Sequence, residues 1–256
     1  MRTHTESVWS TDVIITVDSP CSDAQWQAAR DEVVAFLHHV DAVFSTFKPE
    51  SLVTQLRTGR IDEDDVAGAA ATSVAHADLH EVIGLCRKAL IGSRGAYDPW
   101  AAPGGFDPSG LVKGWAAQRA IDMLVRHGFT SAFVNAGGDI ATVSDGEPWS
   151  IGISDPDEPA ESVAVVHSAG AAVCTSGTYE RGEHVVDPRS RAHSTGARSA
   201  TVVGPDAALA DAYATAICVD GVKSLDWFTA LGPQWSLFIV PPGSRTGYRY
   251  GDAFSQ

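Results

Sequence analysis

Apolar positions along the chain follow two repeats, one typical of strands and one typical of helices. The stretch 12–18, "DVIITVD", alternates apolar and polar residues as a half-buried strand does. The stretch 22–47 opens with a capping pattern, Ser22 with Gln25 three residues later. Its apolar residues then recur at helical spacing, at Trp26, Ala29, Val33, Phe36, Leu37, Val40 and Phe44. The pattern predicts a strand followed by a helix of several turns.

Helical and strand-like stretches alternate in the rest of the chain. Further helices are predicted over about 75–90, 110–127 and 207–220, and Gly128 is placed to end the second of them. Strand-like runs lie at 131–136, 139–143, 149–153, 162–169, 184–188, 198–204 and 236–240. The acidic stretch 59–72 is predicted to be a surface loop or a short helix. This succession, without repeats or a low-complexity linker, predicts an α+β fold with one continuous core.

Charge and composition argue against several classes of partner and location. The net charge is −14 and the pI is about 4.9, which argues against a polyanionic partner such as DNA or an anionic membrane surface. No apolar run approaches the length of a spanning helix, and the first residues lack the apolar stretch of a secretory signal, so a cytoplasmic location is expected. The chain has four cysteines, which stand far apart without a paired spacing: Cys21, Cys86, Cys174 and Cys218. They are expected to be reduced thiols that are buried or have no chemical role.

Several common catalytic and nucleotide motifs are missing. The chain has no G-x-x-x-x-G-K-[ST], and "NAGGDI" (135–140) is not G-x-G-x-x-G, so neither a P-loop nor a standard dinucleotide fold is supported. It also lacks G-x-S-x-G and H-E-x-x-H, which disfavours serine-hydrolase and zincin chemistry.

Lys113 is unusual because it stands in the first turn of the helix predicted over 110–127. The helix macrodipole is positive at that end, so a lysine there adds cation to cation unless it faces an anion.

Asp211 and Thr215 stand four residues apart in the helix predicted over 207–220, so their oxygens share one face. Carboxylate, hydroxyl and carbonyl oxygens suit Mg²⁺. Spacing alone leaves a second explanation open, in which the aspartate caps or solvates the helix and the threonine is a small core residue.

His184 is the candidate general base, because a histidine with a near-neutral pKa can take a proton from a hydroxyl nucleophile. In "HVVDP" it would share one side of a short strand with Val186, before the turn at Asp187. A purely structural histidine is the alternative.

Together these segments resemble the ApbE-type FAD:protein FMN transferases, also called flavin transferases, over roughly residues 4–222. The matching segments include "GAYDPW" (95–100), "FDPSGLVKG" (106–114) and "VNAGGDI" (134–140). The most specific are "TSGTYERGEHVVDP" (175–188) and "ADAYATA" (210–216). The resemblance implies an α+β fold of mixed sheets and helices in a single two-lobed domain over residues 1–256.

The resemblance also implies roles for individual residues. The FAD-binding residues would be Trp9, Phe47, Ala96, Tyr97, Asp98, Asp107, Lys113, His184 and Val185. Mg²⁺ would be held by the carbonyls of Gly110 and Ala214 together with Asp211 and Thr215. Gly137, Gly138 and Asp139 would shape a tight turn beside the site. This chain departs from the family pattern at 9–11, where Met-Gly-Thr reads Trp-Ser-Thr, at Phe47, where a tyrosine is usual, and at Arg57, where asparagine is frequent.

The reaction implied by the resemblance is Mg²⁺-dependent transfer of the FMN moiety of FAD to a Thr or Ser hydroxyl of an acceptor flavoprotein, with release of AMP. His184 would be the catalytic base. Two alternatives stay open: a Mg²⁺-dependent FAD pyrophosphatase that gives FMN and AMP, and a non-catalytic FAD-binding protein. No nucleic-acid partner and no membrane-spanning segment are expected.

Overall fold

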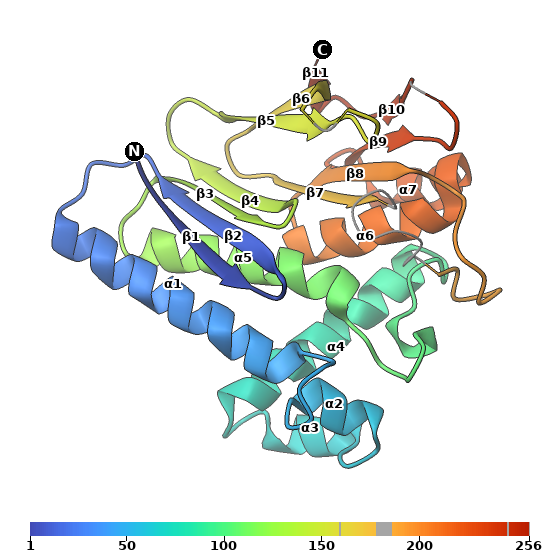
Figure 1. Ribbon diagram of the computed structural model, residues 1–256, viewed down its shortest axis with the longest axis horizontal. Coiled ribbons are helices and arrows are strands. Elements are labelled where there is room, and N and C mark those ends of the chain that lie inside the picture. Colours follow the sequence, from blue (N-terminus) through green and yellow to red (C-terminus); the bar gives the residue numbers. More distant parts are fainter. Residues whose placement is uncertain (159, 178–185, 245, 256) are drawn as a thin grey trace.

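Two antiparallel sheets and a layer of helices make up the protein, and the larger sheet lies in the middle (Figure 1). The computed structural model describes residues 1–158, 160–177, 186–244 and 246–255. The strands of the larger sheet are β1 (Arg2–Val8), β2 (Thr11–Val17), β3 (Ser131–Ala136), β4 (Asp139–Ser144), β7 (Ala172–Gly177), β8 (Ser199–Gly204), β9 (Ser236–Val240) and β10 (Tyr248–Tyr250). They pair in the order β1-β2-β3-β4-β7-β8-β9-β10, and every neighbouring pair is antiparallel.

The smaller sheet covers one face of the larger sheet. It consists of β5 (Trp149–Ser154), β6 (Ser162–Ser168) and β11 (Phe254–Ser255), in the order β11-β6-β5. A second apolar cluster fills the space between the two sheets and includes Ile140, Ile151, Val166, Val203 and Phe238. Strands β8 and β9 are buried along their whole length, because this cluster covers one face and the helices cover the other. Strand β9 therefore has a nearly continuous apolar run, whereas β8 also buries Ser199 and Thr201.

The helices lie on the opposite face of the larger sheet. The long ones are α1 (Asp23–Phe44), α4 (Val74–Gly92), α5 (Ser109–Arg126) and α6 (Ala207–Asp220). The short ones are α2 (Leu52–Arg57), α3 (Glu63–Ala69), α7 (Leu225–Phe228) and the 3₁₀ turns η1 (Pro99–Ala101), η2 (Gly221–Ser224) and η3 (Thr229–Leu231). In Figure 1, α1, α5 and α6 run beneath the sheet, with α2 and α3 farther from it. The main core, between these helices and the sheet, includes Ile15, Val33, Leu37, Leu124 and Val134.

The predicted α+β class is confirmed, and the predicted long helices agree with α1, α4, α5 and α6 within a few residues. The acidic stretch 59–72 contains α3, which a capping box of Asp62 and Asp65 begins. The pattern missed the short helices α2 and α7 and the strands β1, β7, β10 and β11. Strand β7 was missed because only its first half is apolar before "TSG". Of the strand predicted at 184–188, residues 184 and 185 lie outside the described part, and Val186 forms only an isolated bridge with His193.

Helices α5 and α6 approach each other at the level of the backbone. A Cβ atom on Gly110 would lie 3.1 Å from the Thr215 Oγ1. A Cβ on Gly114 would overlap the Ala207 carbonyl and lie 2.9 Å from the Asp211 Cβ. Two glycines one turn apart therefore form the surface of α5 against which α6 packs, and a side chain at Gly114 would force the helices apart.

We predict that Gly114→Ala lowers the free energy of unfolding by roughly 1 to 3 kcal/mol, because the new methyl group meets backbone that cannot rotate away. Gly84→Ala is the matched control. Gly84 is an exposed glycine of helix α4, and a Cβ there meets nothing within 4 Å, so alanine should raise stability by up to about 1 kcal/mol. Urea titration followed by circular dichroism measures both. Equal effects of the two substitutions would show that the helices separate without cost.

Candidate functional site

The α5–α6 crossing brings three of the four predicted metal ligands together. Asp211 is 2% exposed, and its Oδ2 accepts a hydrogen bond from the Gly114 N–H at 3.1 Å. One turn along α6, Thr215 lies against Gly110. The backbone at Gly110 leaves helical geometry, with φ −82° and ψ 23°, which turns its peptide away from the regular helical direction. Asp211 and Thr215 of α6 thus both contact the first turns of α5, Asp211 at Gly114 and Thr215 at Gly110.

This donor set fits Mg²⁺. Carbonyl, carboxylate and hydroxyl oxygens are hard ligands, and Mg²⁺ binds with one or two carboxylates while keeping several waters. Within the described residues no group of three or more His, Cys, Asp or Glu side chains is arranged to hold a metal ion. The fourth predicted ligand, Ala214, is buried inside α6.

The end of β7 also reaches this place. The Ser176 Oγ lies 3.0 Å from the Thr215 Oγ1, and the Cys218 Sγ donates to the Ser176 carbonyl at 3.2 Å. Ser176 was not among the predicted site residues. The sequence offered one signal for Ser176, because it stands just before the segment 178–185, which carries the predicted base.

Lys113 faces a carboxylate of the chain itself, and its contact with FAD stays a prediction. Its ammonium forms an ion pair with Asp139, at the start of β4, and the Asp139 side chain is 0% exposed. Sequence analysis expected Asp139 only to shape a turn with Gly137 and Gly138. The two glycines do adopt positive φ, 65° and 95°, but the aspartate is also the lysine's partner.

Two buried carboxylates set the charge of Lys113. Burial by itself would lower the pKa of this lysine, but the carboxylates of Asp139 and Asp211 outweigh burial and hold the pKa above its ordinary value. Burial raises the pKa of Asp139, and the Lys113 ammonium opposes that shift. Lys113 therefore stays protonated over the whole physiological range and remains a permanent cation beside the α5–α6 oxygens.

Residues before α5 line the same region. The Tyr97 ring lies 3.4 Å from the position of a Cβ on Gly110, so it packs on the kinked turn. Burial raises the Tyr97 pKa well above its ordinary value, and its hydroxyl lies 3.7 Å from the Cys86 Sγ. Ala96 is buried, and the Asp98 carboxylate accepts from the Trp100 N–H at 2.9 Å, capping η1.

Asp107 holds the entry to α5. One oxygen accepts from the Ser109 N–H at 3.0 Å, and the other lies 3.3 Å from the Arg57 Nη1. Arg57 also donates to the Pro103 carbonyl at 2.8 Å. The arginine that departs from the family pattern therefore ties α2 to the chain that enters α5.

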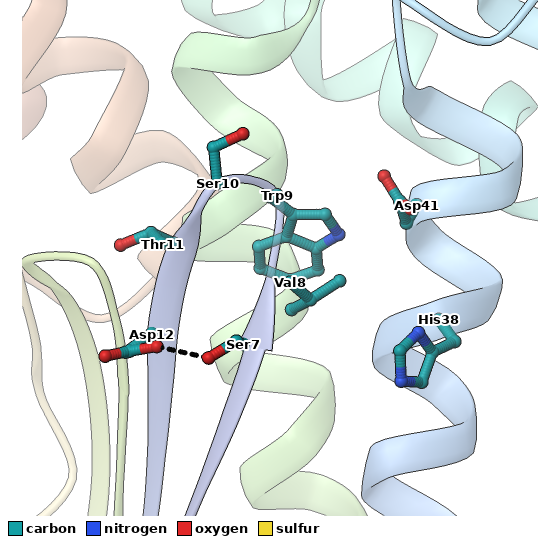
Figure 2. A pocket seen from close by; sticks show the side chains of 8 residues that line it. All are labelled: Ser7, Val8, Trp9, Ser10, Thr11, Asp12, His38 and Asp41. Atoms are coloured by element: carbon teal, nitrogen blue, oxygen red, sulfur yellow. Dashed lines mark hydrogen bonds between the residues drawn. The ribbon is translucent and has the colours of Figure 1, made fainter.

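Trp9 stands at a pocket of about 770 Å³ between the β1–β2 turn and α1 (Figure 2). Trp9 and Ser10 form the turn with φ values of 57° and 58°. Figure 2 shows the indole projecting from the turn toward the side of α1 that carries His38 and Asp41. The Trp9 Nε1 is buried without a hydrogen-bond partner among the described residues. The pocket is lined by Ser7, Val8, Trp9, Ser10, Thr11, Asp12, His38 and Asp41.

Three predicted site residues remain: Phe47, His184 and Val185. Phe47 is 94% exposed in the turn after α1 and does not line the Trp9 pocket, so its role as a flavin contact stays a prediction. His184 and Val185 lie outside the described residues.

Residues 101–235, more than half of the chain, match the model of the ApbE family. The chain belongs to this family. The match covers the whole α5–α6 crossing and Asp139, whereas Trp9 and the 96–98 stretch precede it.

Curated relatives of the ApbE family resemble part of the chain. A protein named FAD:protein FMN transferase from Rhodobacter capsulatus is 37% identical over 152 residues, which is 54% of this chain and 29% of that protein. One of the same name from Treponema pallidum is 31% identical over 159 residues, 53% of this chain and 44% of that protein. The matched region thus spans less than half the length of these relatives.

Solved structures of the family share the fold. Flavin transferase ApbE from Vibrio cholerae has a TM-score of 0.77 at 18% identity, over 97% of this chain and 96% of that one. The ApbE protein from Thermotoga maritima has a TM-score of 0.79 at 21% identity, over the same shares. As in the sequence, nothing in the described helices is long and apolar enough to cross a bilayer.

We predict that Asp139→Asn lowers the free energy of unfolding by about 3 kcal/mol, because it leaves the Lys113 ammonium beside a neutral group in a largely buried place. The double variant Lys113→Met/Asp139→Val, which removes both charges, should recover most of that loss. Urea unfolding midpoints measure both proteins. A single variant as stable as the unchanged protein would show that the pair does not hold β4 to α5.

Proposed function

We propose that this protein transfers the FMN moiety of FAD to a hydroxyl of an acceptor protein. The observation that carries the proposal is the α5–α6 crossing, where Gly110, Asp211 and Thr215 offer hard oxygens next to the permanent cation of Lys113. A pyrophosphate needs opposite charge close to its oxygens, and a lysine next to oxygens suited to Mg²⁺ would meet that need. The family membership and the printed name of the curated relatives support the same reaction.

The site's contribution is mostly electrostatic. Gly110, Asp211 and Thr215 would hold Mg²⁺, with Ala214 a further candidate, and when bound the ion supplies positive charge that neutralises the FAD pyrophosphate. Lys113 supplies a second positive charge, and Asp139 keeps its side chain in place. Asp107, beside the same helix start, is the other proposed contact to the nucleotide. Such positioning of charge lowers the barrier of phosphoryl transfer with little covalent work by the protein.

The chemical step is a displacement at phosphorus. A Thr or Ser hydroxyl of the acceptor attacks the phosphorus on the riboflavin side of FAD, and His184 takes the hydroxyl proton. The new P–O bond joins FMN to the acceptor as a phosphoester, while the pyrophosphate P–O bond breaks and AMP leaves. With water as the nucleophile, the same step gives free FMN and AMP.

The flavin ring is proposed to lie on the aromatic side of the site. Trp9 presents a large ring at a pocket of about 770 Å³, and an indole stacks well on an isoalloxazine. Tyr97 and its neighbours Ala96 and Asp98 line the approach to Gly110, and Val185 and Phe47 complete the proposed set. We also propose that residues 1–256 act as one domain, since both apolar clusters rest on the same eight-stranded sheet. The cytoplasmic location stays a prediction.

The proposal predicts a covalent product. Incubation of this protein with FAD, Mg²⁺ and a candidate acceptor flavoprotein should raise the acceptor's intact mass by one FMN phosphoester and release an equal amount of AMP. EDTA should abolish both. Free FMN and AMP without a modified acceptor would favour the pyrophosphatase, and unchanged FAD would leave only a binding protein. An acceptor whose target Thr or Ser is replaced by Ala is the control.

The metal assignment predicts a change in Mg²⁺ dependence. Asp211→Asn keeps an oxygen for the Gly114 N–H but loses the charge, and Thr215→Val keeps the shape but loses the hydroxyl. Each should raise the Mg²⁺ concentration for half-maximal turnover by roughly tenfold or more, since an interaction with a charged group is worth about 1.5 to 3 kcal/mol. Mg²⁺-induced thermal stabilisation in the presence of FAD should shift in parallel, which tests binding apart from activity.

Thr201→Val is the matched control for the threonine. Thr201 is a buried threonine of β8 whose hydroxyl pairs with Thr175 at 2.9 Å, away from the proposed ligands. If Asp211→Asn and Thr215→Val respond to Mg²⁺ as Thr201→Val does, the two residues are not metal ligands.

A further inference from the structure

A short loop after the segment 178–185 folds back on itself immediately. Val186 forms a bridge with His193, and the Asp187 N–H donates to the Ala192 carbonyl at 2.9 Å. The Arg191 N–H donates back to the Asp187 carbonyl at 2.7 Å. These bonds make 186–193 a closed turn whose first residue comes two positions after His184.

Arg189 ties this turn to the end of helix α6. Its Nε lies 2.9 Å from the Asp187 Oδ1, within the turn, and its Nη2 lies 2.5 Å from the Asp220 Oδ1. The other oxygen of Asp220 accepts from the Trp227 Nε1 at 3.0 Å. One guanidinium therefore joins the turn to the last residue of α6, and α6 in turn is held to α7. We call Arg189, Asp187 and Asp220 the Arg189 clamp.

The charges of the clamp favour this arrangement. Asp220 is the last residue of α6, where the helix macrodipole is negative and a carboxylate alone is unfavourable. A guanidinium offsets that charge and can bond two carboxylates at once through its planar fork. Hydrogen bonding from Arg189 lowers the pKa of Asp187, so the Asp187 carboxylate keeps the charge that the guanidinium meets near neutral pH.

The rest of the loop lies on the same end of α6. The Ser194 Oγ donates to the Cys218 carbonyl at 2.6 Å, and the Ala197 N–H donates to the same carbonyl at 3.1 Å. Gly196 and Gly221 touch through their backbones, so that a Cβ on Gly221 would overlap the Gly196 carbonyl. These contacts take up C-terminal carbonyls of α6 that would otherwise lack partners.

The other end of the segment 178–185 is also held on α6. Ser176, two residues before it, contacts Thr215 and receives the Cys218 thiol. The chain therefore contacts α6 at Ser176, before the segment 178–185, and contacts it again at Arg189, after that segment. The helix that carries Asp211 and Thr215 holds both flanks of the segment that contains the proposed base.

We infer that Arg189 is a positioning residue for catalysis, which sets the place of the His184 segment relative to Asp211 and Thr215 by clamping the chain to the end of α6. The inference rests on the proposed function. Arg189 touches no reacting atom in this role. It acts through the chain, by fixing the point from which the segment with the base extends. A misplacement of about 1 Å in a reacting group can slow a reaction about a hundredfold. Arg189 can therefore change the rate of transfer although it touches no reacting atom.

The test compares Arg189→Ala with Arg189→Lys and with Arg191→Ala. Arg191 lies in the same turn and forms no ion pair with any described residue, so its removal matches the charge change without opening the clamp. We expect Arg189→Ala to reduce the rate of FMN transfer at saturating FAD about tenfold to a hundredfold, with the KM for FAD within about twofold. Arg189→Lys should recover part of the rate, because a lysine can pair with Asp220 but cannot bridge two carboxylates.

Asp220→Asn opens the clamp from the other side, because it removes the charge that Arg189 meets and keeps an oxygen for Trp227. Its effect on the rate should be close to that of Arg189→Ala, and the double variant should be no slower than either single one. Hydrogen exchange at residues 186–197 should speed up in both variants and stay unchanged in Arg191→Ala. This readout does not depend on activity.

Two results would overturn the inference. One is a transfer rate in Arg189→Ala equal to that in Arg191→Ala. The other is a slower rate in Arg189→Ala that is caused only by unfolding of the variant. In that case the variant would transfer FMN at the normal rate per folded molecule at a low temperature. If the unchanged protein neither transfers FMN nor cleaves FAD, the proposed function fails instead. Faster exchange in the two clamp variants would then assign the clamp a purely structural role.

Discussion

The backbone contact between α5 and α6 is the constraint on which the site depends. Gly110 and Gly114 remove the side chains that would keep the helices apart, so Asp211 can accept a hydrogen bond from the backbone of the other helix. A carboxylate bonded in this way has a fixed position without relying on a long and mobile partner. Wider helix separation would cost Asp211 that bond, so the packing of the helices and the arrangement of the proposed ligands depend on the same contact.

Charge balance follows from this packing. Lys113 lies beside the carboxylates of Asp139 and Asp211, and both hold the pKa of the lysine above its ordinary value. A low-dielectric surrounding strengthens each of these interactions. In the proposed function a divalent cation adds positive charge near Lys113, so that the FAD pyrophosphate would meet positive charge from two sides. Lys113 thus pairs with Asp139 in the fold and, in the proposed function, also provides charge at the site.

Helix α6 is the common support of these features. It is apolar almost all round and buried along most of its length, which is typical of a helix enclosed by other elements. Asp211 stands out against that background, because an aspartate in such a helix needs a specific partner. The same helix receives Ser176 from β7 and the clamp of Arg189 at Asp220. Proposed metal ligands and the flanks of the proposed base segment therefore share one rigid element.

The sequence by itself determined the long helices, most of the strands and the family. These follow from spacings of two to four residues, from capping residues such as Ser22, and from motifs that lie within one short stretch. It also indicated that Asp211 and Thr215 share a face, because an i, i+4 pair does so in any helix. Only the tertiary structure decided which groups meet across the chain. Lys113 and Asp139 are 26 residues apart, Arg57 and Asp107 are 50 apart, and Arg189 and Asp220 are 31 apart. Such pairs depend on strand order and helix crossing, which local periodicity does not encode. Phe47 shows the same limit. It continues the apolar helical pattern of the stretch 22–47, but its side chain is exposed where the chain turns away from the core.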